Sequence, residues 1–79
     1  MDIQEKVISI ISDELSVKIE DVKLDSELIQ DLEIDELDNI ELCMALEEEF
    51  GIEIPDEDIE EFKTVKDIVE YVKGHQPNE

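Results

Sequence analysis

The sequence predicts an all-α domain, a four-helix bundle with a short third helix and a long first connection. Three observations carry this prediction. Apolar residues recur at spacings of three and four in several separate segments, which is typical of amphipathic helices. Only two prolines and two glycines occur in the chain, and no strand-like alternation competes with the helical pattern. A chain of 79 residues has room for one core, so we expect a single helical domain over residues 1–74 and a polar tail over 75–79.

The first helix is expected over residues 3–15. Its apolar residues are spaced so that they share one helical face, and they are Ile3, Val7, Ile10, Ile11 and Leu15. Residues 16–30 have weaker periodicity, and we expect a long connection with a short turn of helix near residues 27–30. A connection of this length is unusual in so small a domain, which favours a structured or functional segment.

The second helix is expected to begin at Asp35, whose carboxylate suits an N-cap, with Asp38 reaching back to the cap. We expect a broad apolar arc to face the core, formed by Leu37, Ile40, Cys43, Met44 and Phe50. The opposite side carries an acidic stripe formed by Asp38, Glu41, Ala45 and Glu48. Gly51 is expected to end the helix in a left-handed conformation.

The last two helices follow Pro55. We expect Asp56 to cap a short helix that turns Ile59 and Phe62 inward. Thr64 is expected to cap the final helix, whose inward residues are Val65, Ile68, Val69 and Val72. Gly74 then precedes the polar tail.

The charge is the strongest signal in the composition. Six lysines and no arginine oppose 26 carboxylates, which gives a formal net charge of −20. Between Asp25 and Glu61 there are 17 acidic residues and no lysine. A field of this sign repels nucleic acid phosphates and anionic membranes, and it attracts basic patches on other proteins at rates that fall with added salt. We expect a monomer without nucleic acid or membrane partners, whose fold becomes more stable as salt screens its self-repulsion.

The single cysteine, Cys43, excludes an internal disulfide and fits a reducing compartment, so a cytoplasmic location is expected.

The stretch DLEIDELDNIELCMALEEEFGIEIPDED, residues 31–58, resembles the acyl carrier protein family of fatty acid and polyketide biosynthesis. The resemblance extends over essentially the whole chain and is densest in MALEEEF followed by IEIPDED. It implies a bundle of acyl-carrier-protein type, with an apolar cleft that can shelter an acyl chain. It also implies that the second helix docks onto basic patches of acyl-chain-processing enzymes. The expected partner-binding residues are Asp35, Asp38, Glu41, Met44, Glu47 and Glu48.

One position departs from the family pattern. The family has Asp-Ser-Leu where this chain has Asp35, Glu36 and Leu37, and in the family that serine hydroxyl is joined to 4'-phosphopantetheine through a phosphodiester. Glutamate has no hydroxyl, and attack by a carboxylate would give a labile acyl phosphate. We therefore expect no cofactor on this chain as written. Glu36 does place negative charge where the phosphate of a modified serine would sit.

No other residue is a convincing replacement for that serine. Ser26, in LDSEL, has an aspartate before it but lies ten residues too early and precedes Glu27. It reads as an ordinary loop or capping serine. Cys43 could hold a thioester directly, but its position among apolar residues favours a buried, inert thiol.

Two interpretations follow for the function. In the first, the chain is a carrier-fold protein without the prosthetic group, which acts as an acidic interaction module for basic partners. In the second, it is a genuine acyl carrier in which Glu36 is an engineered replacement of the native serine. That native serine would carry 4'-phosphopantetheine and, on it, acyl thioesters.

Metal binding and catalysis are both disfavoured. DEDIEEF, residues 56–62, lacks the alternating oxygen ligands and central glycine of a calcium loop, so we expect no dedicated metal site. No carboxylate has the apolar surroundings that tune an acid–base pair, and His75 lies in the polar tail without a second histidine. We expect no enzymatic activity.

Overall fold

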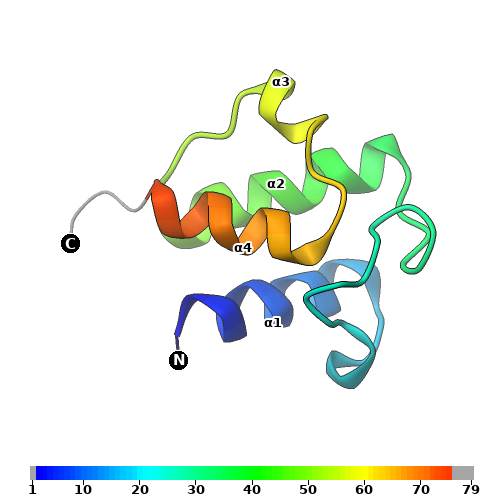
Figure 1. The fold of residues 1–79 in the computed structure, drawn as a ribbon. Helices are drawn as coiled ribbons and strands as arrows, with labels where there is room; N and C mark the ends of the chain where they lie inside the picture. The colour runs from blue at the N-terminus through cyan, green and yellow to red at the C-terminus, as the bar shows by residue number, and fades with distance from the viewer. Residues whose placement is uncertain (1, 76–79) are drawn as a thin grey trace.

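The computed structural model describes residues 2–75, which fold into four α-helices and one turn of 3-10 helix. The elements are α1 (Ile3–Leu15), the 3-10 turn η1 (Ile19–Asp21), α2 (Glu36–Phe50), α3 (Asp56–Ile59) and α4 (Val65–Gly74). Helix α1 packs against both α2 and α4, while the short α3 packs on α2. Figure 1 shows α3 at the opposite side of the molecule from α1, and the long connection between α1 and α2 closing one end. The predicted fold class is confirmed.

The ends of α1 and α2 follow from their terminal residues. Asp2 caps α1 by accepting a 2.8 Å hydrogen bond from the backbone N–H of Glu5. Helix α1 ends at Ser16, which adopts a left-handed conformation with φ 58°. Helix α2 begins with the predicted capping box of Asp35 and Asp38 and ends at Gly51, with φ 66°. Each of these devices satisfies backbone groups that a helix end leaves without partners.

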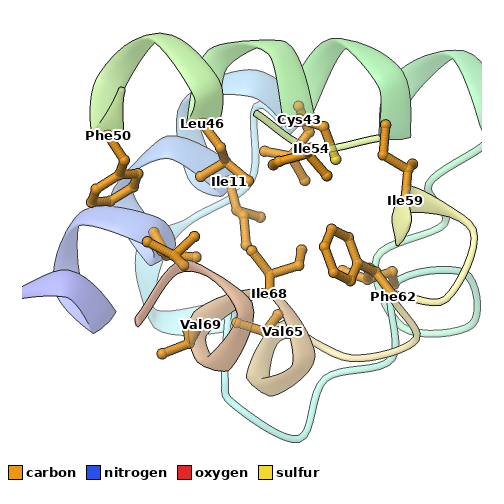
Figure 2. Close-up of a cluster of buried hydrophobic side chains, with 14 of the residues drawn as sticks. Ile11, Cys43, Leu46, Phe50, Ile54, Ile59, Phe62, Val65, Ile68 and Val69 are labelled. Atoms are coloured by element: carbon orange, nitrogen blue, oxygen red, sulfur yellow. The ribbon is translucent and has the colours of Figure 1, made fainter. Parts of the chain in front are cut away.

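The core lies between the helices and is almost wholly apolar. Figure 2 shows side chains from every α-helix converging on one cluster, with Ile11 from α1, Leu46 from α2, Ile59 from α3 and Ile68 from α4 among them. The segment between α2 and α3 adds Ile52 and Ile54. Burying one such side chain contributes about 1.5–3 kcal/mol to stability, so this cluster is the main stabilising element of a small domain.

The connection between α1 and α2 is structured, as its length predicted. Its helical turn, however, lies at Ile19–Asp21 rather than near residues 27–30. At 27–31 the chain forms a single hydrogen-bonded turn instead, in which the Asp31 N–H donates to the Glu27 carbonyl. This turn does not continue as a helix, because the N–H of Leu32 also donates to the Glu27 carbonyl and Glu33 adopts a left-handed conformation with φ 56°. The N–H of Leu28 donates to the Lys63 carbonyl on a distant segment.

Residues 24–28 lie alongside residues 63–66. Three backbone hydrogen bonds join these segments, from Leu28 to Lys63, from Val65 to Ser26 and from Lys66 to Leu24. Glu27 and Thr64 form an isolated antiparallel bridge within this pairing. These hydrogen bonds hold the connection against the beginning of α4, and they therefore set the path by which the chain reaches α2.

The beginning of α3 differs from the prediction. Pro55 occupies the N-cap position and no side chain caps the helix, while Asp56 lies in its first turn. A carboxylate in the first turn still interacts favourably with the helix dipole. Ile59 and Phe62 are buried as predicted. Thr64 caps α4 and forms a capping box with Asp67, and the four predicted inward residues of α4 are all buried.

The predicted polar tail begins at a residue that has defined contacts. The ring of His75 stacks on that of Tyr71, with centroids 4.0 Å apart, and its Nδ1 lies 2.8 Å from the Tyr71 carbonyl oxygen. His75 thus extends the surface of α4, a contact that its polar sequence surroundings did not indicate. Residues 76–79 of the predicted tail lie outside the described residues.

Candidate functional site

The first turn of α2 holds three carboxylates with different roles. Asp35 Oδ1 accepts a 2.8 Å hydrogen bond from the Asp38 N–H, and Asp38 Oδ2 lies 3.5 Å from the Asp35 N–H. These two side chains therefore cap the N-terminus of α2. Glu36, the first residue of the helix, is exposed, and its carboxylate has no hydrogen bond or ion pair within residues 2–75. Of these three carboxylates, Glu36 is the one that does not take part in the cap.

Two hollows open beside Glu36. The smaller has a volume of about 120 Å³ and lies between Glu36, Asn39 and Ile40 of α2 and the segment Asp56–Glu60. The larger has a volume of about 550 Å³ and adds Ile29, Ile34 and Phe62. Apolar walls and a carboxylate-lined mouth are therefore combined at this end of the bundle.

The residue at this position does not fit the covalent attachment of phosphopantetheine. A phosphodiester needs an alcohol oxygen on the protein, and Glu36 offers only a carboxylate. Its exposure makes it accessible, but accessibility does not supply the missing hydroxyl. The group that the resemblance implied therefore has no chemically suitable anchor in the first turn of α2.

The outer face of α2 is apolar as well as acidic, which corrects the predicted arc. Leu37, Ile40 and Met44 were expected to face the core, but they are 63%, 39% and 58% exposed. The inner face is formed instead by Leu42, Cys43, Leu46 and Phe50, of which the prediction named only two. The exposed apolar residues recur at spacings of three and four, so they share one side of the helix.

The predicted partner-binding residues occupy different environments. Glu41, Met44 and Glu48 are exposed on α2. Glu47 is half-buried and accepts a 2.7 Å hydrogen bond from the backbone N–H of Ile54. Its carboxylate therefore holds the segment between α2 and α3 against α2. The spacing of residues along one helix does not reveal this role.

Helix α3 is held in place by two further polar side chains. The Tyr71 hydroxyl donates a 2.7 Å hydrogen bond to Asp58 Oδ2, and Asn39 Nδ2 donates to the Ile59 carbonyl at 3.3 Å. Partial burial and the hydrogen bond to Asp58 raise the pKa of Tyr71 to about 12. Spacing along the chain does not reveal these contacts, because each joins segments more than ten residues apart.

The two alternative attachment residues lie in protected positions. Ser26 is buried, and its Oγ accepts a 3.0 Å hydrogen bond from the Lys23 N–H. It is a loop serine, as predicted. Cys43 is also buried, and burial, with the nearby charge of Glu47, raises the pKa of its thiol to about 12. The thiolate that a nucleophile requires is therefore strongly disfavoured.

The family model described as the phosphopantetheine attachment site matches residues 5–72, which run from the first turns of α1 almost to the end of α4.

The chain belongs to the phosphopantetheine-attachment family of carrier domains. Carrier domains of this kind are typically non-catalytic. Within residues 2–75, no group of three or more side chains is arranged to hold a metal ion. No helix in that range has the length and apolar character needed to cross a membrane.

Proposed function

We propose that this carrier domain, with glutamate at position 36, acts as an acidic docking module for basic partner proteins and carries no phosphopantetheine. It would occupy the carrier-binding surface of an acyl-chain-processing enzyme without delivering an acyl group, and without catalysis of its own. The observation that carries the proposal is the exposed carboxylate of Glu36 in the first turn of α2, where the resemblance implies an attachment serine.

The outer face of α2 supports the docking role. Leu37 and Met44 are more than half exposed and lie among the exposed carboxylates of Glu36, Glu41 and Glu48. Apolar side chains give a partner surface to bury, while the carboxylates select a basic partner and accelerate its approach. The Asp38 carboxylate takes part in the helix cap, and the Glu47 carboxylate accepts a hydrogen bond from the N–H of Ile54. We therefore propose that both side chains stabilise the structure behind this face and do not contact the partner themselves.

A second function is favoured by the family membership itself. If the natural protein has serine at position 36, the same fold would be a genuine acyl carrier, loaded with 4'-phosphopantetheine at that position. The codon for residue 36 in the gene separates the two functions directly. Nothing else in the bundle would need to change, because Glu36 is exposed and has no hydrogen-bond partner within residues 2–75.

Competition for a modifying enzyme tests the docking role. A Glu36→Ser variant is incubated with coenzyme A and a phosphopantetheinyl transferase, and its initial loading rate is followed by mass spectrometry. The unaltered chain is then added as a competitor. We expect it to slow loading competitively, because it retains the docking face and lacks the nucleophile.

Variants of the competitor locate the contact. Leu37→Ala combined with Met44→Ala is expected to weaken the inhibition about thirtyfold, since each buried anchor contributes about 1 kcal/mol to binding. Ile19→Ala is the matched control, because Ile19 is 58% exposed but lies in η1. Equal inhibition by both variants, or no inhibition by the unaltered chain, would contradict the proposed docking face.

A further inference from the structure

A groove runs between α1 and α2. It consists of two adjoining hollows, of about 350 Å³ and 270 Å³, which share Glu14 of α1 and Ala45 and Glu48 of α2. Ile10 and Ala45 give the groove apolar lining, and Met44 adds an exposed apolar side chain at one end. The groove is shallow and combines a small apolar patch with a lining that consists mostly of carboxylates.

The two helices run antiparallel along this groove. At one end Lys6 of α1 meets Glu49 of α2, and at the other Glu14 of α1 shares a hollow with Glu41 of α2. From residue 6 to residue 14 a helix rises about 12 Å, which is a little over two turns. The length suits about two turns of a helical segment from a partner.

Carboxylates from both helices border the groove. Asp13 and Glu14 project from α1, and Glu41, Glu48 and Glu49 from α2, and all five residues are exposed. Among residues 2–75, only Glu49 of this set has an ion pair, which is with Lys6 at 3.7 Å. The other four carboxylates repel one another across the groove, and cations placed between them would relieve this repulsion.

The Lys6–Glu49 contact shows that a lysine side chain can pair with a carboxylate at the edge of the groove. Lys6 lies on α1 and extends to the α2 side of the groove, where both side chains remain nearly half exposed, at 42% and 47%. A lysine from the chain itself thus already bridges the helices at one end. The remaining carboxylates continue the same border, without a cation of their own among the described residues.

We propose that the α1–α2 groove binds a basic amphipathic helix of a partner protein, with apolar side chains over Ile10 and Ala45 and lysines or arginines between the two acidic borders. This inference rests on the proposed docking function and extends it, because it adds Asp13 and Glu14 of α1 to a contact otherwise confined to α2. Met44, Glu41 and Glu48 belong to both the outer face and the groove, so one partner can cover both surfaces.

A designed peptide tests the groove. The peptide has about 12 residues, which span about 18 Å as a helix, with a leucine stripe flanked by lysines and blocked ends. Its control has glutamine in place of every lysine. The ¹⁵N-labelled chain is titrated with each peptide at low and at high salt. We expect the lysine peptide to shift the amide signals of Ile10, Asp13, Glu14 and Ala45, with weaker binding at high salt and little binding of the control.

Charge-matched variants separate the groove from the outer face. Asp13→Asn combined with Glu14→Gln should raise the Kd of the lysine peptide about three- to tenfold, as expected for two exposed ion pairs. Glu5→Gln combined with Glu20→Gln removes the same charge from exposed positions that do not line the groove, and should change the Kd less than twofold. Circular dichroism checks that both double variants keep their helices.

Each remaining outcome is decisive. Equal Kd values for the two double variants would contradict the proposal that the peptide binds in the groove, because net charge alone would then explain the binding. Shifts confined to Leu37 and Ile40, which line neither hollow, would overturn the proposed groove binding and leave the docking function of α2 intact. No binding of the lysine peptide at low salt would overturn both.

Discussion

Helices α2 and α4 begin with the same device and use their apolar residues differently. Each starts with a capping box, formed by Asp35 and Asp38 in α2 and by Thr64 and Asp67 in α4. In α4, every aliphatic residue from Val65 to Val72 is buried. In α2, an equally well-capped helix leaves three large apolar side chains in solvent. Helix α4 therefore buries all of these residues in the core, whereas α2 buries one apolar face and leaves a second one exposed, which is the face that we propose binds a partner.

The largest effect expected from this comparison is on stability. Ile68→Ala in α4 removes a fully buried side chain and should lower the free energy of unfolding by about 2–5 kcal/mol. Met44→Ala in α2 removes a side chain that is 58% exposed and should change it by less than about 0.5 kcal/mol. Urea denaturation of the two variants measures both values.

The difference between these two stability changes is expected to depend on the burial of the side chain and not on the residue type. Leu42→Ala, on the buried side of α2, should therefore resemble Ile68→Ala, and Leu37→Ala should resemble Met44→Ala. If Met44→Ala or Leu37→Ala destabilised the fold as much as Leu42→Ala, the outer face of α2 would be part of the core and the comparison would fail.

The next effect is a loss of stability at high pH that comes from the inner face of α2. The pKa of Cys43 is raised to about 12 in the fold, against about 8.5 in an unfolded chain. The unfolded state therefore releases its proton first, and stability falls as pH rises above about 8.5 and up to the folded pKa. At pH 10.5 this should amount to roughly 2–3 kcal/mol.

A Cys43→Ala variant isolates that contribution. Urea denaturation at pH 8 and pH 10.5 should show a smaller alkaline loss for the variant than for the unaltered chain. The variant should keep a residual loss, because Tyr71 also has a pKa raised to about 12. Identical alkaline losses in the two proteins would mean that Cys43 is not protected by burial.

The two capping boxes offer a smaller and more closely matched test. Thr64→Ala should cost about 1 kcal/mol of stability through the lost cap. Asp35→Ala loses an equivalent hydrogen bond, but it also removes one of three adjacent carboxylates, with Glu36 and Asp38 remaining. Because that relieves repulsion, we expect a smaller loss for Asp35→Ala, and the difference should shrink when 1 M salt screens the charges. Thermal melts at low and high salt measure it, and a larger loss for Asp35→Ala would contradict the electrostatic reasoning.

The smallest expected effects concern the exposed ion pairs. Glu49→Gln removes the contact with Lys6, and Glu70→Gln removes the contact with Lys66 on α4. Both should change the free energy of unfolding by less than about 0.5 kcal/mol, since exposed pairs contribute little. Urea denaturation checks this, and a loss above 1 kcal/mol for Glu49→Gln would assign the α1–α2 border a structural role instead of a binding role.

The sequence predicts the helices of this protein well because their boundaries depend on local chemistry. The bounds of α1, the capping boxes at Asp35 and Thr64, and the left-handed end at Gly51 each depend on residues a few positions apart. The inward residues of α4 follow from their spacing, because that helix has one narrow apolar side.

The faces of α2 could not be predicted in the same way. Its apolar residues extend around most of the helix, so two arcs were compatible with helical spacing. The packing of α1 and α3 on α2 decides between them, because Leu42 and Leu46 are buried in the folded domain while Leu37 and Met44 are exposed. The family resemblance predicts a docking role for Glu47, whereas its hydrogen bond to Ile54 depends on the path of the chain beyond Gly51.

We propose that this chain carries no phosphopantetheine, and the intact mass of the unaltered protein tests this proposal most directly. The protein is incubated with coenzyme A and a phosphopantetheinyl transferase that loads the Glu36→Ser variant under the same conditions. We predict an unchanged mass for the unaltered chain. A stable gain of one phosphopantetheine on it would contradict the claim.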